Sequence, residues 1–267
     1  MGNRFLRRTD ACVVVQKLAL KAIFERKLIN EGDKILIAAS GGKDSTVMAW
    51  ALSTLRPALK INFSLEALHI LNDFSVKGGE AELAARFNGW GIPFTAISVP
   101  VIERLKEGRK MNCYWCSTQR RTELIRFALE NGFNKIALGH HMDDIIETFF
   151  MNMTGKGQLS TMPMSLSYRK YPLKLIRPLG YLEERQIIAA AEELDILRIS
   201  CTCPYGLNSG RRNMRDRIAV FTGNSGAVKR RILSALSAGA KDLLIEDEEN
   251  AEGNAEGNAD EKADGIN

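Results

Sequence analysis

Apolar residues follow two alternating patterns along this chain. Short apolar runs between polar turns are typical of buried β-strands, and apolar residues every three or four positions are typical of helices. Strands are predicted at 34–39, 64–71, 94–99, 134–138 and 173–178, with a short extended segment at 196–200. Helices are predicted at 11–29, 44–55, 80–90, 118–130, 142–153 and 182–194. Pro57 is expected to end the second helix and Gly91 to cap the third.

Strands that alternate with helices of this length predict an α/β fold built on a doubly wound parallel sheet. Ligands of such sheets bind beyond the carboxyl ends of the strands. Three polar segments follow strands in this way: 40–45, 72–73 and 139–141. We therefore expect all three segments at one edge of the sheet.

Changes in composition divide the chain into four parts. An N-terminal helical segment, 1–30, precedes a main domain at 31–205. Beyond it, residues 206–245 combine arginines and lysines with helical apolar spacing, which predicts a small basic helical appendage. Residues 246–267 are acidic and contain almost no apolar side chain, so disorder is expected there.

The net charge of +5 conceals an asymmetry. The acidic tail holds nine acidic residues and one lysine, so the rest of the chain carries +13. A body that is so basic favours a polyanionic partner such as a nucleic acid. A generic solubility charge is the alternative.

No apolar stretch is long enough to span a bilayer, and the N-terminus lacks the apolar core of a signal peptide. We expect a cytoplasmic protein with no membrane partner. Five cysteines, an odd number, argue against a disulfide framework. Cys12 lies in an apolar helical run and is interpreted as a core residue. Exposed apolar positions of the first helix would suit either a homodimer or ordinary packing.

The segment Ser40-Gly41-Gly42-Lys43-Asp44-Ser45 lies between a predicted strand and a predicted helix. The two glycines allow backbone N–H groups to approach an anion, and the helix directs its positive end toward the same point. Lys43 adds a positive charge and Ser45 a hydroxyl. Its spacing differs from a Walker A loop. It resembles the pyrophosphate loop (PP-loop) of enzymes that split ATP between the α and β phosphates.

A second polar motif follows the fourth predicted strand. It reads Gly139-His140-His141-Met142-Asp143-Asp144 and leads into a helix. His140 and Asp144 are four positions apart and share a helical face. Carboxylates near a phosphate loop can hold Mg²⁺, whereas an isolated Asp-Asp pair would only complement the helix dipole. Beside the PP-loop, we favour the metal interpretation.

The remaining cysteines form two groups, Cys113-x-x-Cys116 and Cys201-x-Cys203. Thiolates this close can share a metal ion or an iron–sulfur cluster. The second spacing is unusual for zinc. A redox dithiol is an alternative, although the first pair does not directly follow a strand as in a thioredoxin motif.

Together these motifs resemble the tRNA 2-thiocytidine synthetases, a family of PP-loop tRNA sulfurtransferases. The resemblance covers about residues 10–235 and rests on segments 40–45, 62–65, 113–121, 138–144 and 176–179 and on the late cysteine. It implies a PP-loop fold of the adenine nucleotide α hydrolase type. It also implies an ATP- and Mg²⁺-dependent thiolation that uses a three-cysteine [4Fe–4S] cluster.

The family pattern assigns roles to individual residues. ATP binding falls to Ser40, Gly41, Gly42, Lys43, Asp44, Ser45, Gly139 and His140, and catalysis to Lys43, Asp44 and Asp144. Cluster ligation falls to Cys113, Cys116 and Cys203, with Cys201 open because the family spacing there is Cys-x-x-Cys. Adenine is expected near 69–71. RNA phosphates are expected at Arg120, Arg121, Arg211, Arg212 and Arg215, with a solvated helix face as the alternative for part of this charge.

The implied reaction adenylates the C2 oxygen of a tRNA pyrimidine, cytidine in this family, and replaces it with sulfur. The implied partners are tRNA and a sulfur donor such as a cysteine desulfurase. Two alternatives remain: a PP-loop enzyme that transfers or removes sulfur on a small molecule, and a non-enzymatic sensor that binds ATP and a cluster.

Overall fold

A six-stranded sheet forms the centre of the computed structural model, which describes residues 10–75, 78–105, 107–196 and 210–238. The strand order is β3-β2-β1-β4-β6-β5. The bounds are β1 Lys34–Ala38, β2 Ser64–Leu71, β3 Phe94–Ser98, β4 Lys135–Ala137, β5 Ser165–Ser167 and β6 Lys174–Ile176. All neighbouring strands are parallel except β5, which pairs with β6 in the antiparallel sense. The expected α/β sheet is therefore confirmed, with one antiparallel edge strand added.

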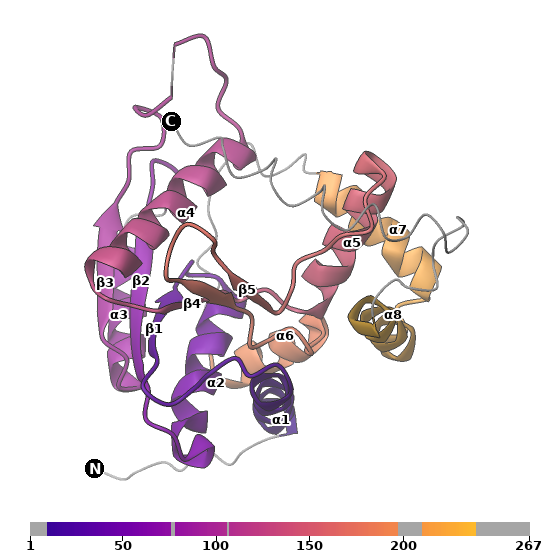
Figure 1. The fold of residues 1–267 in the computed structure, drawn as a ribbon, viewed down its shortest axis with the longest axis horizontal. Helices are drawn as coiled ribbons and strands as arrows, with labels where there is room; N and C mark the ends of the chain where they lie inside the picture. The colour runs from indigo at the N-terminus through magenta and orange to yellow at the C-terminus, as the bar shows by residue number, and fades with distance from the viewer. Residues whose placement is uncertain (1–9, 76–77, 106, 197–209, 239–267) are drawn as a thin grey trace.

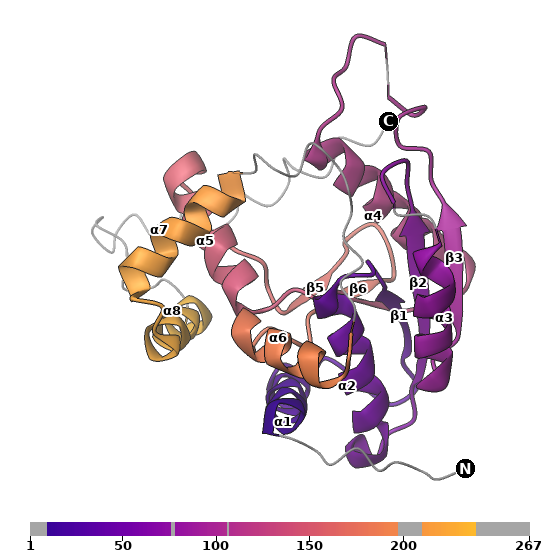
Figure 2. The same ribbon diagram turned by 180° about the vertical axis from the view of Figure 1, so that it is seen from behind.

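Helices cover both faces of this sheet. Their bounds are α1 Asp10–Glu25, α2 Lys43–Leu59, α3 Gly79–Gly89, α4 Cys113–Glu130, α5 Met142–Lys156, α6 Glu184–Glu193, α7 Gly210–Thr222 and α8 Gly226–Ala238. Helix α4 crosses in front of the strands in Figure 1, whereas α2, α3 and α6 lie on the opposite side in Figure 2. The chain is thus doubly wound, as its strand–helix alternation predicts.

The core has two apolar clusters, one on each side of the sheet. The larger one unites the sheet with α1, α2, α3 and α6, and the smaller one lies between the sheet and α4. The sequence of β1 is apolar at consecutive positions because both faces of this strand are buried. Ile35 and Ile37 belong to the larger cluster, and Leu36 between them belongs to the smaller one. A strand buried on both faces needs apolar side chains in both directions.

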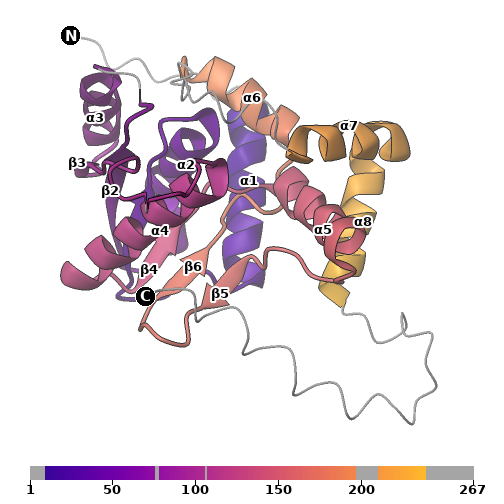
Figure 3. The ribbon, with the colours of Figure 1, turned by 90° about the horizontal axis from the view of Figure 1, so that it is seen from above.

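Helices α7 and α8 lie within 206–245, the segment for which a basic helical appendage was expected, and we call these two helices the appendage. Both pack against α5, on its side away from the sheet (Figure 3). Met214 and Ile218 of α7 and Leu233 of α8 join the larger core cluster. The appendage is therefore fixed to the main domain by apolar contacts. The acidic tail 246–267 and most of segment 196–200 lie outside the described residues.

Expected helix boundaries differ from the structure at α1, which ends at Glu25 rather than at 29, and at α2 and α4, and one strand was missed. Pro57 does not end α2, which continues to Leu59; Leu55 and Leu59 are both buried, and their packing offsets the hydrogen bond that proline cannot donate. Helix α4 begins at Cys113 rather than near 118, because the Asn112 side chain caps it by accepting the N–H of Trp115 at 2.8 Å. The edge strand β5 was not expected, since three residues carry too little periodicity.

No helix among the residues that the structure describes is long and apolar enough to cross a membrane.

Candidate active site

The site lies where the strand order of the sheet reverses. Strand β1 is flanked by β2 on one side and β4 on the other, and all three run parallel. The chain leaves β1 into the loop 40–45 and leaves β4 into the segment 139–141. Both segments thus meet at the carboxyl edge, at the switch point where α/β sheets bind ligands. Segment 72–73 follows β2 at this edge, so the expected grouping is confirmed.

The loop 40–45 is held in shape by its own serines. The Ser45 hydroxyl donates to the Gly42 carbonyl at 3.1 Å and accepts from the Ser40 N–H at 3.2 Å. Gly41 has φ +80°, a conformation that favours glycine. Helix α2 starts at Lys43, and its first-turn N–H groups have no acceptor within the helix. The loop therefore presents backbone donors to an anion, while the buried Ser45 hydroxyl supports the loop from within.

Gly139 brings the two edge segments into direct contact. A Cβ atom at this position would lie 2.8 Å from the Ser45 nitrogen and 3.0 Å from the Asp44 carbonyl carbon. Only glycine permits this close approach of the two backbones. Gly139 thus supports the loop 40–45 from the neighbouring strand.

A cavity of about 370 Å³ opens between this edge and α4. Its wall unites the loop 40–45, the segment that follows β4, the middle of α4 and the edge strands. The lining residues include Ser40, Asp44, Ser45, Ser117, Arg120, Arg121, Gly139, His140, Asp144 and Tyr168. Apolar side chains of α4, β4 and β6 line the rest of it. The cavity is large enough for a small ligand and combines apolar walls with a few charged groups, as binding sites do.

All three aspartates at this edge lie close to one buried histidine, His141, whose Nδ1 is 3.6 Å from Asp143 Oδ2. His141 Nε2 lies 3.9 Å from Asp44 Oδ1 and 3.4 Å from Asp144 Oδ2. The Asp144 carboxylate also accepts a hydrogen bond from the backbone N–H of His141 at 3.1 Å, which fixes the Asp144 side chain at the start of α5. Mg²⁺ prefers oxygen ligands such as carboxylates, so Asp44 and Asp144, which both line this cavity, fit two of the ligands of a magnesium ion.

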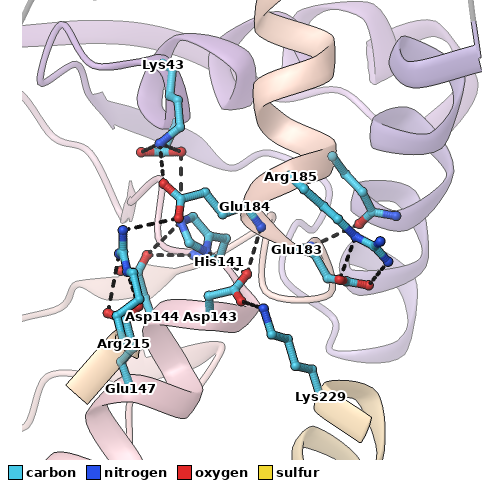
Figure 4. A network of polar contacts seen from close by, with 12 residues as sticks. Lys43, His141, Asp143, Asp144, Glu147, Glu183, Glu184, Arg185, Arg215 and Lys229 are labelled. Carbon is cyan, nitrogen blue, oxygen red and sulfur yellow. Dashed lines mark hydrogen bonds and ion pairs between the residues drawn. The ribbon is translucent and has the colours of Figure 1, made fainter. Parts of the chain in front are cut away.

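Asp143 lies on the Nδ1 side of His141 and has a structural role. Its carboxylate accepts from Lys229 of α8 at 2.6 Å and from the Glu184 N–H of α6 at 2.7 Å (Figure 4). Burial raises the pKa of Asp143, but the hydrogen bonds from Lys229 and Glu184 outweigh this effect and the net pKa is lowered. Asp143 thus joins α5, α6 and α8.

Lys43 lies within a network of charges that reaches the appendage (Figure 4). Its Nζ is 3.1 Å from Asp44 and 2.9 Å from Glu184 of α6. The other oxygen of Glu184 is 3.2 Å from Arg215 of α7, which also donates to the buried Glu147 at 2.6 Å. Burial lowers the pKa of Lys43, but the two carboxylates outweigh it, and the net pKa is raised. Arg215, expected at RNA, is engaged by carboxylates of the protein.

Cys113 and Cys116 occupy the first turn of α4 at the same edge. Cys113 is exposed and Cys116 is half-buried, with the Asn72 amide 3.7 Å from its sulfur. Thiols three positions apart in a helix share one face. The pair therefore fits two ligands of a metal cluster. Cys201 and Cys203 lie outside the described residues, so the third ligand stays a prediction.

Cys12 contrasts with this pair. It is buried in α1, and burial, with the nearby Glu193 carboxylate, raises its pKa to about 12. Its interpretation as a core residue is confirmed.

The histidines that were considered for ATP have different settings. His140 lines the cavity, and its Nδ1 accepts from Arg177 of the segment after β6 at 3.3 Å. His69, near the position expected for adenine, is buried: its Nδ1 is 2.6 Å from the Ala39 carbonyl and its ring stacks on Phe94. The ring of His69 joins β2 to the end of β1.

The predicted arginines are divided between two regions. Arg120 and Arg121 line the cavity from α4, beside the loop 40–45. Arg211 and Arg212 belong to α7, but their side chains lie outside what the structure describes. Arg120 and Arg121 are therefore part of the site, and RNA contact by Arg211 and Arg212 stays a prediction.

Sequence reasoning missed Glu184, the structural support from His141, and the cavity-lining Tyr168. Glu184 follows the segment Ile176-Arg177-Pro178-Leu179, which was noted only for its family resemblance. That segment leaves the carboxyl end of β6, so the same edge rule could have pointed to the first acidic residues after it.

Comparisons with known proteins agree with this geometry. The sequence profile of the PP-loop domain family matches residues 14–199. The U34-tRNA thiolase NcsA from Methanococcus maripaludis, solved with its [4Fe–4S] cluster, is similar in structure: the TM-score is 0.69 at 26% identity, over 85% of this chain and 78% of that one.

Curated relatives are more similar in sequence. The tRNA-cytidine(32) 2-sulfurtransferase of Methylobacillus flagellatus is 37% identical over 226 residues, which cover 82% of this chain and 73% of that protein. The protein of the same name from Citrifermentans bemidjiense is 33% identical over 81% of this chain and 87% of its own length. The chain therefore belongs to the PP-loop family and, within it, to the tRNA 2-sulfurtransferases.

Proposed function

We propose that this protein is an ATP-dependent sulfurtransferase that converts a cytidine of tRNA to 2-thiocytidine. One observation carries the proposal: the PP-loop 40–45, the carboxylates of Asp44 and Asp144 and the pair Cys113 and Cys116 lie at the same edge of the sheet. The curated relatives, named for cytidine 32, support the choice of base. A small-molecule substrate and a sensor role lack such support. The cytoplasm is the expected location.

The first half of the reaction activates the base. ATP phosphates bind the N–H groups at the start of α2, and Lys43 and the loop donors stabilise charge on the departing pyrophosphate. Mg²⁺ held by Asp44 and Asp144 neutralises phosphate charge when it is bound. The C2 oxygen of cytidine attacks the α phosphorus, the bond to pyrophosphate breaks, and the oxygen becomes a good leaving group in the adenylated base.

The second half replaces that oxygen. Cys113, Cys116 and Cys203 would hold a [4Fe–4S] cluster, and a cluster with three cysteine ligands supplies an open iron position that can carry sulfide. Attack of sulfur at C2 expels the oxygen with AMP. A cysteine desulfurase is the class of enzyme that would supply the sulfur as a persulfide, and a thiol reductant, oxidised to a disulfide, would release it as sulfide.

The target base must leave its stack to enter the cavity. Arg120 and Arg121 face the cavity from α4 and would bind phosphates there. The side chains of Arg211 and Arg212 are proposed as further phosphate contacts. We do not extend this role to Arg215, because Glu147 and Glu184 hold its guanidinium.

Complementation tests the proposed function. The chain is expressed in a bacterial strain whose own tRNA-cytidine 2-sulfurtransferase gene is deleted, and tRNA nucleosides are measured by mass spectrometry. We expect 2-thiocytidine to return. The Lys43→Ala variant, produced at the same level, should not restore 2-thiocytidine because the departing pyrophosphate loses the ammonium group of Lys43. Return of a different thiolated nucleoside would change the proposed base. Unchanged thiolated nucleosides with soluble wild-type protein would overturn the proposal.

A further inference from the structure

The orientation of the Lys43 side chain is fixed by its surroundings. Its side chain is 15% exposed, and the ammonium group lies between the carboxylate of Asp44, its neighbour in the chain, and that of Glu184, which is 141 positions away. Lys43 is the first residue of α2, so its backbone is fixed by the loop. The direction of the ammonium group therefore depends on two carboxylates, of which only Glu184 comes from another element.

Glu184 is itself held from three sides (Figure 4). It begins α6, and its N–H donates to Asp143 at 2.7 Å. One carboxylate oxygen contacts Lys43 at 2.9 Å, and the other contacts Arg215 at 3.2 Å. Arg215 is fixed in turn by two hydrogen bonds to Glu147, whose side chain is 2% exposed. Glu184 thus has little freedom to rotate away from Lys43.

We infer that Glu184 is a positioning residue for Lys43, and that Arg215 of the appendage keeps Glu184 in place. The inference rests on the proposed role of Lys43 at the ATP phosphates. A lysine with four rotatable side-chain bonds loses conformational freedom when it is fixed on a phosphate, and a preplaced partner removes part of that cost before ATP arrives. The appendage thereby contributes to the chemistry of the loop as well as to any contact with RNA.

The neighbouring Glu183 supplies a matched control. It precedes Glu184 at the start of α6, and its carboxylate contacts Arg185 at 2.8 Å and Arg230 of α8 at 2.9 Å. Glu183→Gln thus removes one buried charge from the same turn while the Lys43–Glu184 pair is kept. An effect of α6 distortion would appear in both variants, whereas positioning of Lys43 would be lost only in Glu184→Gln.

The experiment measures tRNA-stimulated pyrophosphate release by the cluster-loaded full chain, with kcat and the KM for ATP determined separately. Glu184→Gln is expected to lower kcat about tenfold, because a misdirected lysine stabilises the departing pyrophosphate less, and to change KM much less. Glu183→Gln is expected to retain wild-type kcat. The affinity for tRNA should be unchanged in both variants.

A double-mutant comparison separates positioning from a merely structural effect. In single-turnover reactions, Glu184→Gln should have no further effect when Lys43 is already alanine, because Glu184 acts through Lys43. Equal and additive losses in both backgrounds would overturn the inference. If Glu184→Gln does not fold by circular dichroism, Glu184→Asp, which keeps the charge on a shorter side chain, replaces it in the same comparison.

Failure of the inference is distinguishable from failure of the proposed function. Wild-type kcat in Glu184→Gln, with kcat strongly lowered but still measurable in Lys43→Ala, would refute the positioning of Lys43 by Glu184 and leave the proposed function standing. Undiminished pyrophosphate release in Lys43→Ala would refute the role of the loop lysine and with it the positioning by Glu184, whereas the proposed function fails only if wild-type protein restores no thiolated nucleoside.

Discussion

At the scale of single residues, Gly139 makes the tightest contact of the site. A methyl group there would press on the backbone of Asp44 and Ser45, so Gly139→Ala should displace the loop that is proposed to bind the ATP phosphates. We expect kcat/KM for ATP to fall at least about tenfold, measured as pyrophosphate release. Gly155→Ala is the control: its Cβ would meet nothing within 4 Å in α5, and it should leave kcat/KM unchanged while stabilising the helix by about 0.5–1 kcal/mol in urea unfolding. Equal activity of the two variants would contradict the role of Gly139.

At the scale of elements, α1 and α4 place their thiols in opposite environments. Alkylation by iodoacetamide at pH 8, followed by peptide mass spectrometry, should modify Cys113 and Cys116 in the apo protein, because Cys113 is exposed and Cys116 is only half-buried. Cys12, with its pKa raised to about 12 by burial, should react only after unfolding. Loading iron and sulfide should protect Cys113, Cys116 and one of Cys201 and Cys203, which names the third ligand. Undiminished labelling of the α4 pair in cluster-loaded protein would remove both residues from the ligand set.

At the scale of the whole molecule, the charge available to RNA is smaller than the composition indicates. Arg215, Lys229 and Arg230 of the appendage each pair with a carboxylate of the main domain. The remaining basic groups should still make tRNA affinity depend steeply on salt, with a loss of about 10³-fold between 50 and 200 mM for some six phosphate contacts. Removal of residues 246–267 should leave that slope unchanged if the acidic tail is inert. A flat salt dependence in filter binding would contradict a phosphate-based interface.

Sequence alone determined the parts of this protein that depend on neighbouring residues. The alternating strands and helices, the loop 40–45, the motif at 139–144 and the cysteine pair were all readable, because backbone conformation and short spacing decide them. At α2 the packing of Leu55 and Leu59 carried the helix past Pro57, which no local signal indicates. At α4 the Asn112 cap was a local signal, but the apolar periodicity that was used to place the helix starts later.

Only the tertiary structure decided which distant charges meet. Nothing in the sequence near Lys43 names Glu184 as its partner, because the pairing depends on how β6, which lies beside β4, leads into α6 and how α6 packs against α2. The same holds for Arg215. The basic composition of its segment suggested a contact with RNA, but the packing of α7 on α5 pairs Arg215 with Glu147 and Glu184. Pairing across the fold is set by chain topology and side-chain reach, and neither is visible in the local pattern of residues.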